Sequence, residues 1–123
     1  MRSRAVLVAA LSHPSPRARL RAAKELTRRR DAVVVRPLTQ IVRLCDDADA
    51  VEEALHLLRT VIEVAPGAIA IRDLERLAAL DLPDVHYRAE DQKTFLMDQG
   101  RYPAQPSDVC SLARRALNQR ARA

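Results

Sequence analysis

The sequence predicts an all-α protein, and three observations support this. Alanine, leucine and arginine, which are strong helix formers, dominate the 123 residues. Only 2% of the residues are aromatic and only two are glycine, whereas strands and tight turns favour aromatic residues and glycine. Apolar residues also recur at helical spacing along most of the chain. With 48% apolar residues, the chain is expected to form one packed domain.

The first helices of the predicted pairs share an apolar edge that recurs every thirty-three residues. The matching triplets are Ala5, Leu38 and Ile71; Val8, Ile41 and Leu74; and Leu11, Leu44 and Leu77. Because the triplets are offset by three residues, they place one apolar edge on three copies of one helix. The pattern predicts three helix pairs and a C-terminal helix, near residues 3–30, 34–65, 68–99 and 107–120.

Local signals justify each helix in order. The first pair is expected at 3–12 and 16–30, because Ser15 can cap a helix and proline is favoured at its first position. The second pair is expected at 34–45 and 49–65, with the acidic residues from Asp46 to Asp49 placed at the positive end of a helix.

The third pair is expected at 68–80 and 84–99. Asp84 is placed to cap its second helix, and Gly100 to end it. A loop with two prolines follows, and Ser107 is expected to cap the last helix, 107–120.

The arrangement resembles the HEAT and armadillo family of helical repeats. Residues 11–26 (LSHPSPRARLRAAKEL) are similar to the loop and second helix of that family, and residues 44–58 are a second match. The resemblance implies a short right-handed stack of about three helix pairs that serves as a binding scaffold, without catalysis or a cofactor. The second copy departs from the pattern at Glu52, where the family has arginine, and the third copy departs further. An irregular helical bundle is the alternative.

A basic stripe is the first candidate site. Arg17, Arg21, Lys24 and Arg28 are spaced to share one face of the helix 16–30, opposite its apolar residues. Such a stripe suits an acidic peptide of a protein partner, or alternatively a nucleic-acid backbone. In the alternative, the stripe pairs with the next helix of the same chain. A shift of thirty-two residues aligns Asp49, Glu53 and His56 with Arg17, Arg21 and Lys24.

The first helix is the second candidate site, because it is apolar on all sides. Val6 and Leu7 align with Thr39 and Gln40 of the second copy, whereas a terminal repeat normally has a polar outer face. This predicts contact with a partner, which could be a second copy of the chain. In the alternative, the last helix or a loop of the same chain covers these residues.

Catalytic, cofactor-binding and metal-binding residues are not predicted. The three histidines lie far apart without ligands at metal-binding spacing, and no phosphate-binding glycine loop or nucleophile motif is present. Cys45 and Cys110 are expected to be buried thiols in a reducing compartment. No segment has the ~20 apolar residues that span a membrane, so a cytoplasmic location without membrane contact is expected.

The predicted function is therefore a non-enzymatic protein-interaction module, which binds a partner through its concave face or its apolar first helix. Binding of a nucleic-acid backbone through the basic stripe is the alternative. A DNA-repair enzyme built on such repeats is a third possibility, but the chain has few aromatic residues to hold an extruded base.

Overall fold

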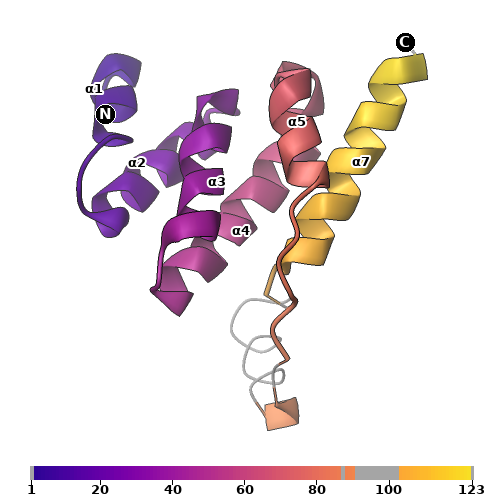
Figure 1. Cartoon of the computed structure of the whole chain (residues 1–123). Helices are drawn as coiled ribbons and strands as arrows, with labels where there is room; N and C mark the ends of the chain where they lie inside the picture. Colours follow the sequence, from indigo (N-terminus) through magenta and orange to yellow (C-terminus); the bar gives the residue numbers. More distant parts are fainter. Residues whose placement is uncertain (1, 87, 91–102, 123) are drawn as a thin grey trace.

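A computed structural model describes residues 2–86, 88–90 and 103–122 of the chain (Figure 1). The described residues contain helices and no strand, which confirms the all-α prediction. The helices are α1 (Arg4–Ala10), α2 (Pro16–Arg28), α3 (Val35–Leu44), α4 (Ala48–Val64), α5 (Ile71–Ala78) and α7 (Pro106–Arg122). Two short 3-10 helices, η1 (Ala32–Val34) and η2 (Pro66–Ala68), precede α3 and α5.

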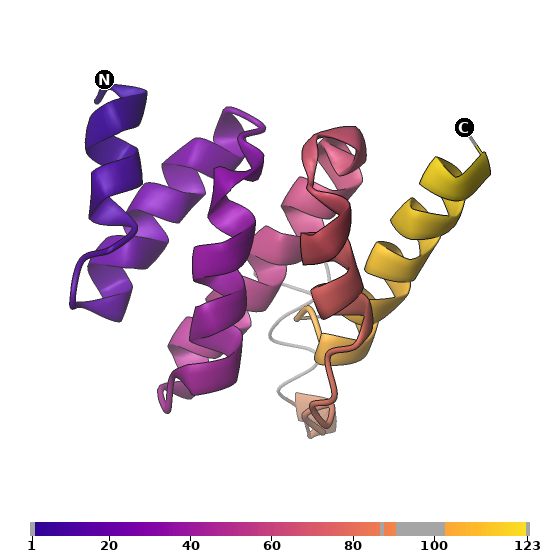
Figure 2. The ribbon, with the colours of Figure 1, turned by 45° about the horizontal axis from the view of Figure 1, so that its top comes forward.

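The helices lie in two layers, which Figure 2 shows most clearly. α1, α3 and α5 follow one another in the first layer, and α2, α4 and α7 in the second. Each first-layer helix packs on the helix behind it: α1 on α2, α3 on α4, and α5 on α7. α4 also contacts both α2 and α7, so the second layer is continuous. The result is three helix pairs in a row, with the two ends of the chain at opposite ends of the row.

The second helix of the third pair differs from the sequence-based prediction. That helix was expected at 84–99, but residues 84–86 and 88 are not helical; residues 89–90 are helical, and residues 87 and 91–99 lie outside the described part of the chain. α7 occupies the corresponding position, because it packs on both α5 and α4. The predicted extra C-terminal helix therefore completes the third pair.

Asp84 caps α7 and not a helix of its own. Its carboxylate accepts hydrogen bonds from the Ser107 backbone N–H at 3.0 Å and from the Ser107 hydroxyl at 2.6 Å. These bonds hold the pKa of Asp84 below its ordinary value. Beside them, the side-chain amide of Gln105 donates to the Val85 carbonyl and accepts from the Val85 N–H, at 2.8 and 2.9 Å. The segment that leaves α5 is thereby attached to the first turn of α7.

Small buried residues occur on both α2 and α4, which pack against each other. Ala22 and Ala54 have 1% and 0% of their surface exposed. Leu26 and Leu58, the aligned leucines of the two helices, are also completely buried.

Residues that recur every thirty-three positions in the first helices are only partly equivalent in burial. The triplet of Val8, Ile41 and Leu74 faces the core in all three helices. The other two triplets are not equivalent. Leu44 is 79% exposed although its counterparts are buried, and Ile71 is 52% exposed although Leu38 is buried.

The first-layer helices are also unequally spaced along the chain. α1, α3 and α5 begin at Arg4, Val35 and Ile71, so the step from the first to the second is shorter than the step to the third. Each residue turns a helix by about 100°, so a shift of one or two residues moves a side chain from the core to the surface. Residues that recur at equal spacing in the sequence are therefore not equally buried.

Caps and cysteines follow the predictions in part. Asp47 caps α4, because its carboxylate accepts from the backbone N–H groups of Asp49 and Ala50 at 3.0 and 3.4 Å. Ser15 stands at the start of α2 but its side chain makes no capping bond. Cys45 and Cys110 are free thiols, as expected, but they are half-buried and not fully buried.

Candidate functional site

The four residues of the basic stripe share one exposed face of α2, as predicted. Arg17, Arg21, Lys24 and Arg28 are exposed, whereas the opposite face is buried. Arg28 pairs with Glu25 of the same helix at 3.4 Å. Within the described part of the chain, no carboxylate oxygen lies within 4.0 Å of the charged nitrogen atoms of the other three.

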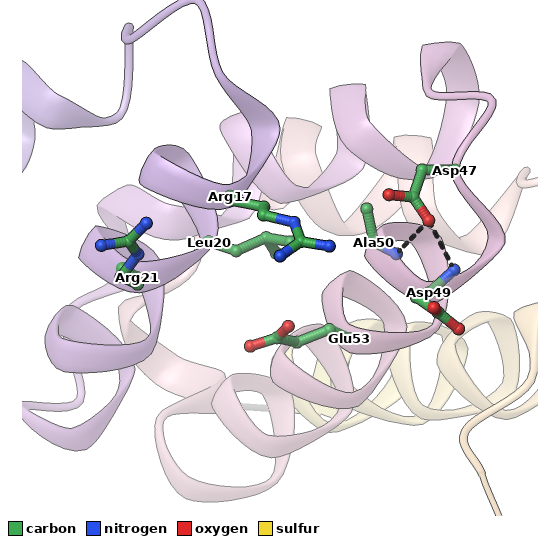
Figure 3. A pocket seen from close by; sticks show the side chains of 7 residues that line it. All are labelled: Arg17, Leu20, Arg21, Asp47, Asp49, Ala50 and Glu53. Carbon is green, nitrogen blue, oxygen red and sulfur yellow. Dashed lines mark hydrogen bonds between the residues drawn. The ribbon is translucent and has the colours of Figure 1, made fainter.

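A groove of about 280 Å³ separates the first turns of α2 from those of α4 (Figure 3). Its α2 wall carries Arg17 and Arg21, and its α4 wall carries acidic residues. The floor is apolar, because Leu20 and Ala50 are only 3% and 5% exposed. The complete lining is Arg17, Leu20, Arg21, Asp47, Asp49, Ala50 and Glu53.

Opposite charges face each other across this groove without forming ion pairs. In Figure 3, Arg17 extends from α2 toward α4, and Glu53 extends from α4 toward α2. Asp47 is already engaged as the cap of α4. The predicted internal pairing is therefore wrong in its detail, since Asp49 and Glu53 lie beside the stripe but close no ion pair with it. The groove keeps charged groups of both signs available to solvent.

The prediction of an apolar docking face on α1 is wrong for Leu7. Leu7 is 1% exposed and belongs to the core, together with Leu11. Val6 is 52% exposed, because consecutive residues of a helix face directions about 100° apart. The alignment misled the prediction, because it matched the buried Leu7 with the exposed Gln40 and the exposed Val6 with Thr39. Thr39 is itself buried and donates its hydroxyl proton to the Val35 carbonyl at 2.7 Å. One exposed valine remains of this candidate.

Sequence reasoning missed a second charged surface, on the first layer. Two open depressions that share Asp73 lie over η1, α3 and α5 and the end of α2. Their lining contains six arginines and two aspartates, so cations outnumber anions by four. We call these six arginines the arginine face; they are Arg4, Arg29, Arg30, Arg36, Arg43 and Arg76. The signal in the sequence was the excess of eleven basic over two acidic residues within 1–43.

Among the described residues, no group of three or more histidine, cysteine, aspartate or glutamate side chains is arranged to hold a metal ion. No helix of the described part is long and apolar enough to cross a membrane.

Comparisons of the chain with models of protein families, with curated proteins and with solved structures found no match. The function proposed for the groove therefore rests on its own residues and on their chemistry.

Proposed function

We propose that this chain is a small non-enzymatic protein-interaction module whose α2–α4 groove binds an extended segment of a partner protein. One observation carries the proposal. Arg17 and Glu53 extend toward each other across an open groove that Arg21 and Asp49 also line, and no ion pair closes it. A partner with charged side chains of both signs satisfies both walls at once.

The chemistry of each wall defines the segment that fits. Planar guanidinium groups donate two parallel hydrogen bonds to a carboxylate, so Arg17 and Arg21 suit an acidic side chain. Glu53 on the other wall suits a lysine or arginine. Leu20 and Ala50 on the floor offer only a small apolar contact. Solvent-exposed pairs of this kind contribute about 0–1 kcal/mol each, so they add little to the affinity. The arrangement of the charges determines which segments fit the groove.

Nucleic-acid binding through the basic stripe is less favoured by this geometry. A phosphate backbone that approached Arg17 and Arg21 would also approach the carboxylates of Asp49 and Glu53. Like charges at short distance repel, and this repulsion opposes the attraction of the arginines.

The finer architecture remains part of the proposal. Three helix pairs in a row support a short HEAT-like or armadillo-like stack, while the unequal spacing of α1, α3 and α5 is a departure from a regular repeat. Free thiols at Cys45 and Cys110 suit a reducing compartment such as the cytoplasm. A homodimer through α1 is no longer proposed, because Leu7 lies in the core.

Nuclear magnetic resonance of the ¹⁵N-labelled chain tests the groove. The probes are two synthetic peptides, one of alternating glutamate and lysine and one of glutamate alone. We expect the mixed peptide to shift the amide signals near Arg17, Arg21 and Glu53, and the Glu53→Gln variant to weaken its binding. The matched control is Glu63→Gln, which removes an exposed carboxylate of the same helix outside the groove. Shifts confined to other surfaces, or equal binding by both variants, would contradict the proposal.

A further inference from the structure

The arginine face lies over η1, α3, α5 and the end of α2, away from the groove at the first turns of α2 and α4, and its charge balance is different. Figure 1 shows α3 and α5 side by side in the front layer, with α1 at the end of the row. The groove lining contains more acidic than basic residues, whereas the lining of the arginine face contains six arginines and two aspartates. The face therefore suits a partner rich in negative charge, which the groove does not.

The two aspartates hold arginines in place and leave a surplus of positive charge. Asp31 accepts from Arg4 at 2.6 Å, and this bond keeps the pKa of Asp31 below its ordinary value. Asp73 accepts from Arg36 at 3.0 Å and lies 3.6 Å from Arg76. Each aspartate is mostly buried, whereas its arginine partners are exposed. The carboxylates thus orient guanidinium groups at the surface without cancelling them.

Arg30 and Arg43 carry the surplus. Both are exposed and line the two depressions. Within the described residues, no carboxylate oxygen lies within 4.0 Å of their charged nitrogen atoms. These two guanidinium groups are available to a ligand.

Arg30 has a backbone conformation that glycine adopts more easily. Its φ is 58°, which is the left-handed region. The N–H of Arg30 bonds the Thr27 carbonyl and the N–H of Asp31 bonds the Leu26 carbonyl, at 2.9 and 3.0 Å, which is the usual glycine-favouring end of a helix. An arginine at this position costs stability, and such strain in an exposed depression points to a role for the side chain.

The shape and composition of the face favour duplex nucleic acid. The depressions are open and extend over several helices, so they match a row of phosphates better than one enclosed group. Arginine forks bind phosphate oxygens in pairs. Single strands favour aromatic stacking platforms, and the described residues contain no phenylalanine, tyrosine or tryptophan. The exposed parts of the lining also lack the large apolar anchors that peptide interfaces favour.

We infer that the arginine face binds the phosphate backbone of duplex nucleic acid, through Arg30 and Arg43 and the arginines that Asp31 and Asp73 orient. This surface is separate from the groove proposed above, so one can fail without the other. Contacts to phosphates carry no sequence information, and binding through them is expected to be independent of sequence.

Fluorescence anisotropy with a labelled short DNA duplex tests this inference on the full chain. The salt concentration is varied from about 50 to 200 mM, because each phosphate contact contributes about −0.9 to the slope of log K against log salt. The test variant is Arg30→Gly with Arg43→Gln. The matched control is Arg17→Gln with Arg21→Gln, which removes the same charge from the groove at the first turns of α2. Circular dichroism checks that both variants keep their helices.

The expected result separates the two faces. Loss of two phosphate contacts weakens binding by about tenfold or more at 100 mM salt and makes the slope shallower by about 1.8. The affinity of the control variant for the duplex stays within about threefold of that of the unmodified chain, because the control changes only long-range attraction. Equal weakening by both variants, no binding at 50 mM salt, or equally tight competition by poly-glutamate would each overturn the inference. The last result would identify an acidic polypeptide as the partner.

Discussion

Replacement of Arg30 by glycine tests the backbone strain on which the arginine face partly rests. Left-handed backbone costs a non-glycine residue about 1–2 kcal/mol. Glycine removes that cost but adds about 0.5–1 kcal/mol of conformational entropy to the unfolded chain. The exposed Arg30 side chain makes no ion pair with the described residues, so its removal forfeits little. We therefore expect Arg30→Gly to stabilise the fold by about 0.5–1 kcal/mol.

Urea denaturation followed by circular dichroism measures this change. The midpoint should rise while the slope m stays constant, because the surface exposed on unfolding is the same. For a chain of this size the melting temperature should rise by about 2–5 °C. Arg30→Lys is the control, since it keeps both the charge and the strained backbone, and its stability should stay within about 0.5 kcal/mol of the original.

Two results would refute the reasoning. A loss of stability in Arg30→Gly would show that the arginine side chain contributes more than its backbone costs. Equal stabilisation by glycine and lysine would show that the arginine side chain itself, and neither the charge nor the backbone, is the destabilising feature.

Three further predictions concern the core, two aspartates with lowered pKa values, and the attachment of α7. Leu7→Ala should lower the free energy of unfolding by about 2–5 kcal/mol in urea, whereas Leu44→Ala should change it by less than about 0.5 kcal/mol; similar losses would contradict the assignment of Leu7 to the core. Asp31 and Asp84 have lowered pKa values in the folded state, so their stabilisation is complete above the ordinary value of 3.8 and is lost as the pH falls below it; thermal melts from pH 7 to about 2 should show that loss, and a flat profile would contradict it. Asp84→Ala should lower the melting temperature at pH 7 and expose the amides at the start of α7 to faster hydrogen exchange, whereas unchanged exchange there would show that the cap is dispensable.

Local signals explain why the helices themselves could be predicted. The helix expected at 16–30 is observed at Pro16–Arg28, and the one expected at 49–65 at Ala48–Val64. Proline at a first position and a carboxylate before a helix act within a few residues, so they can be recognised without tertiary contacts. The same is true of the basic stripe, because residues three and four apart share a helix face by geometry alone.

Long-range contacts explain where the predictions for the site failed. Leu7 was expected at a partner surface, and only the packing of the first pair shows that it faces the core. The pairing expected between the stripe and the acidic residues of α4 depended on the distance between two helices, which alignment cannot supply. The arginine face was missed because its members come from α1, the end of α2, α3 and α5.

The sequence by itself determined the helical class, most helix boundaries, an acidic cap between Asp46 and Asp49 and the exposed stripe on α2, because each depends on neighbouring residues. Tertiary structure alone decided that α7 completes the third pair, that Asp84 caps it from a distance, and that arginines of separate helices share one surface. The physical reason is rotational. A helix turns by about 100° at each residue, so a small offset in how helices pack changes which side chains are buried and which groups meet.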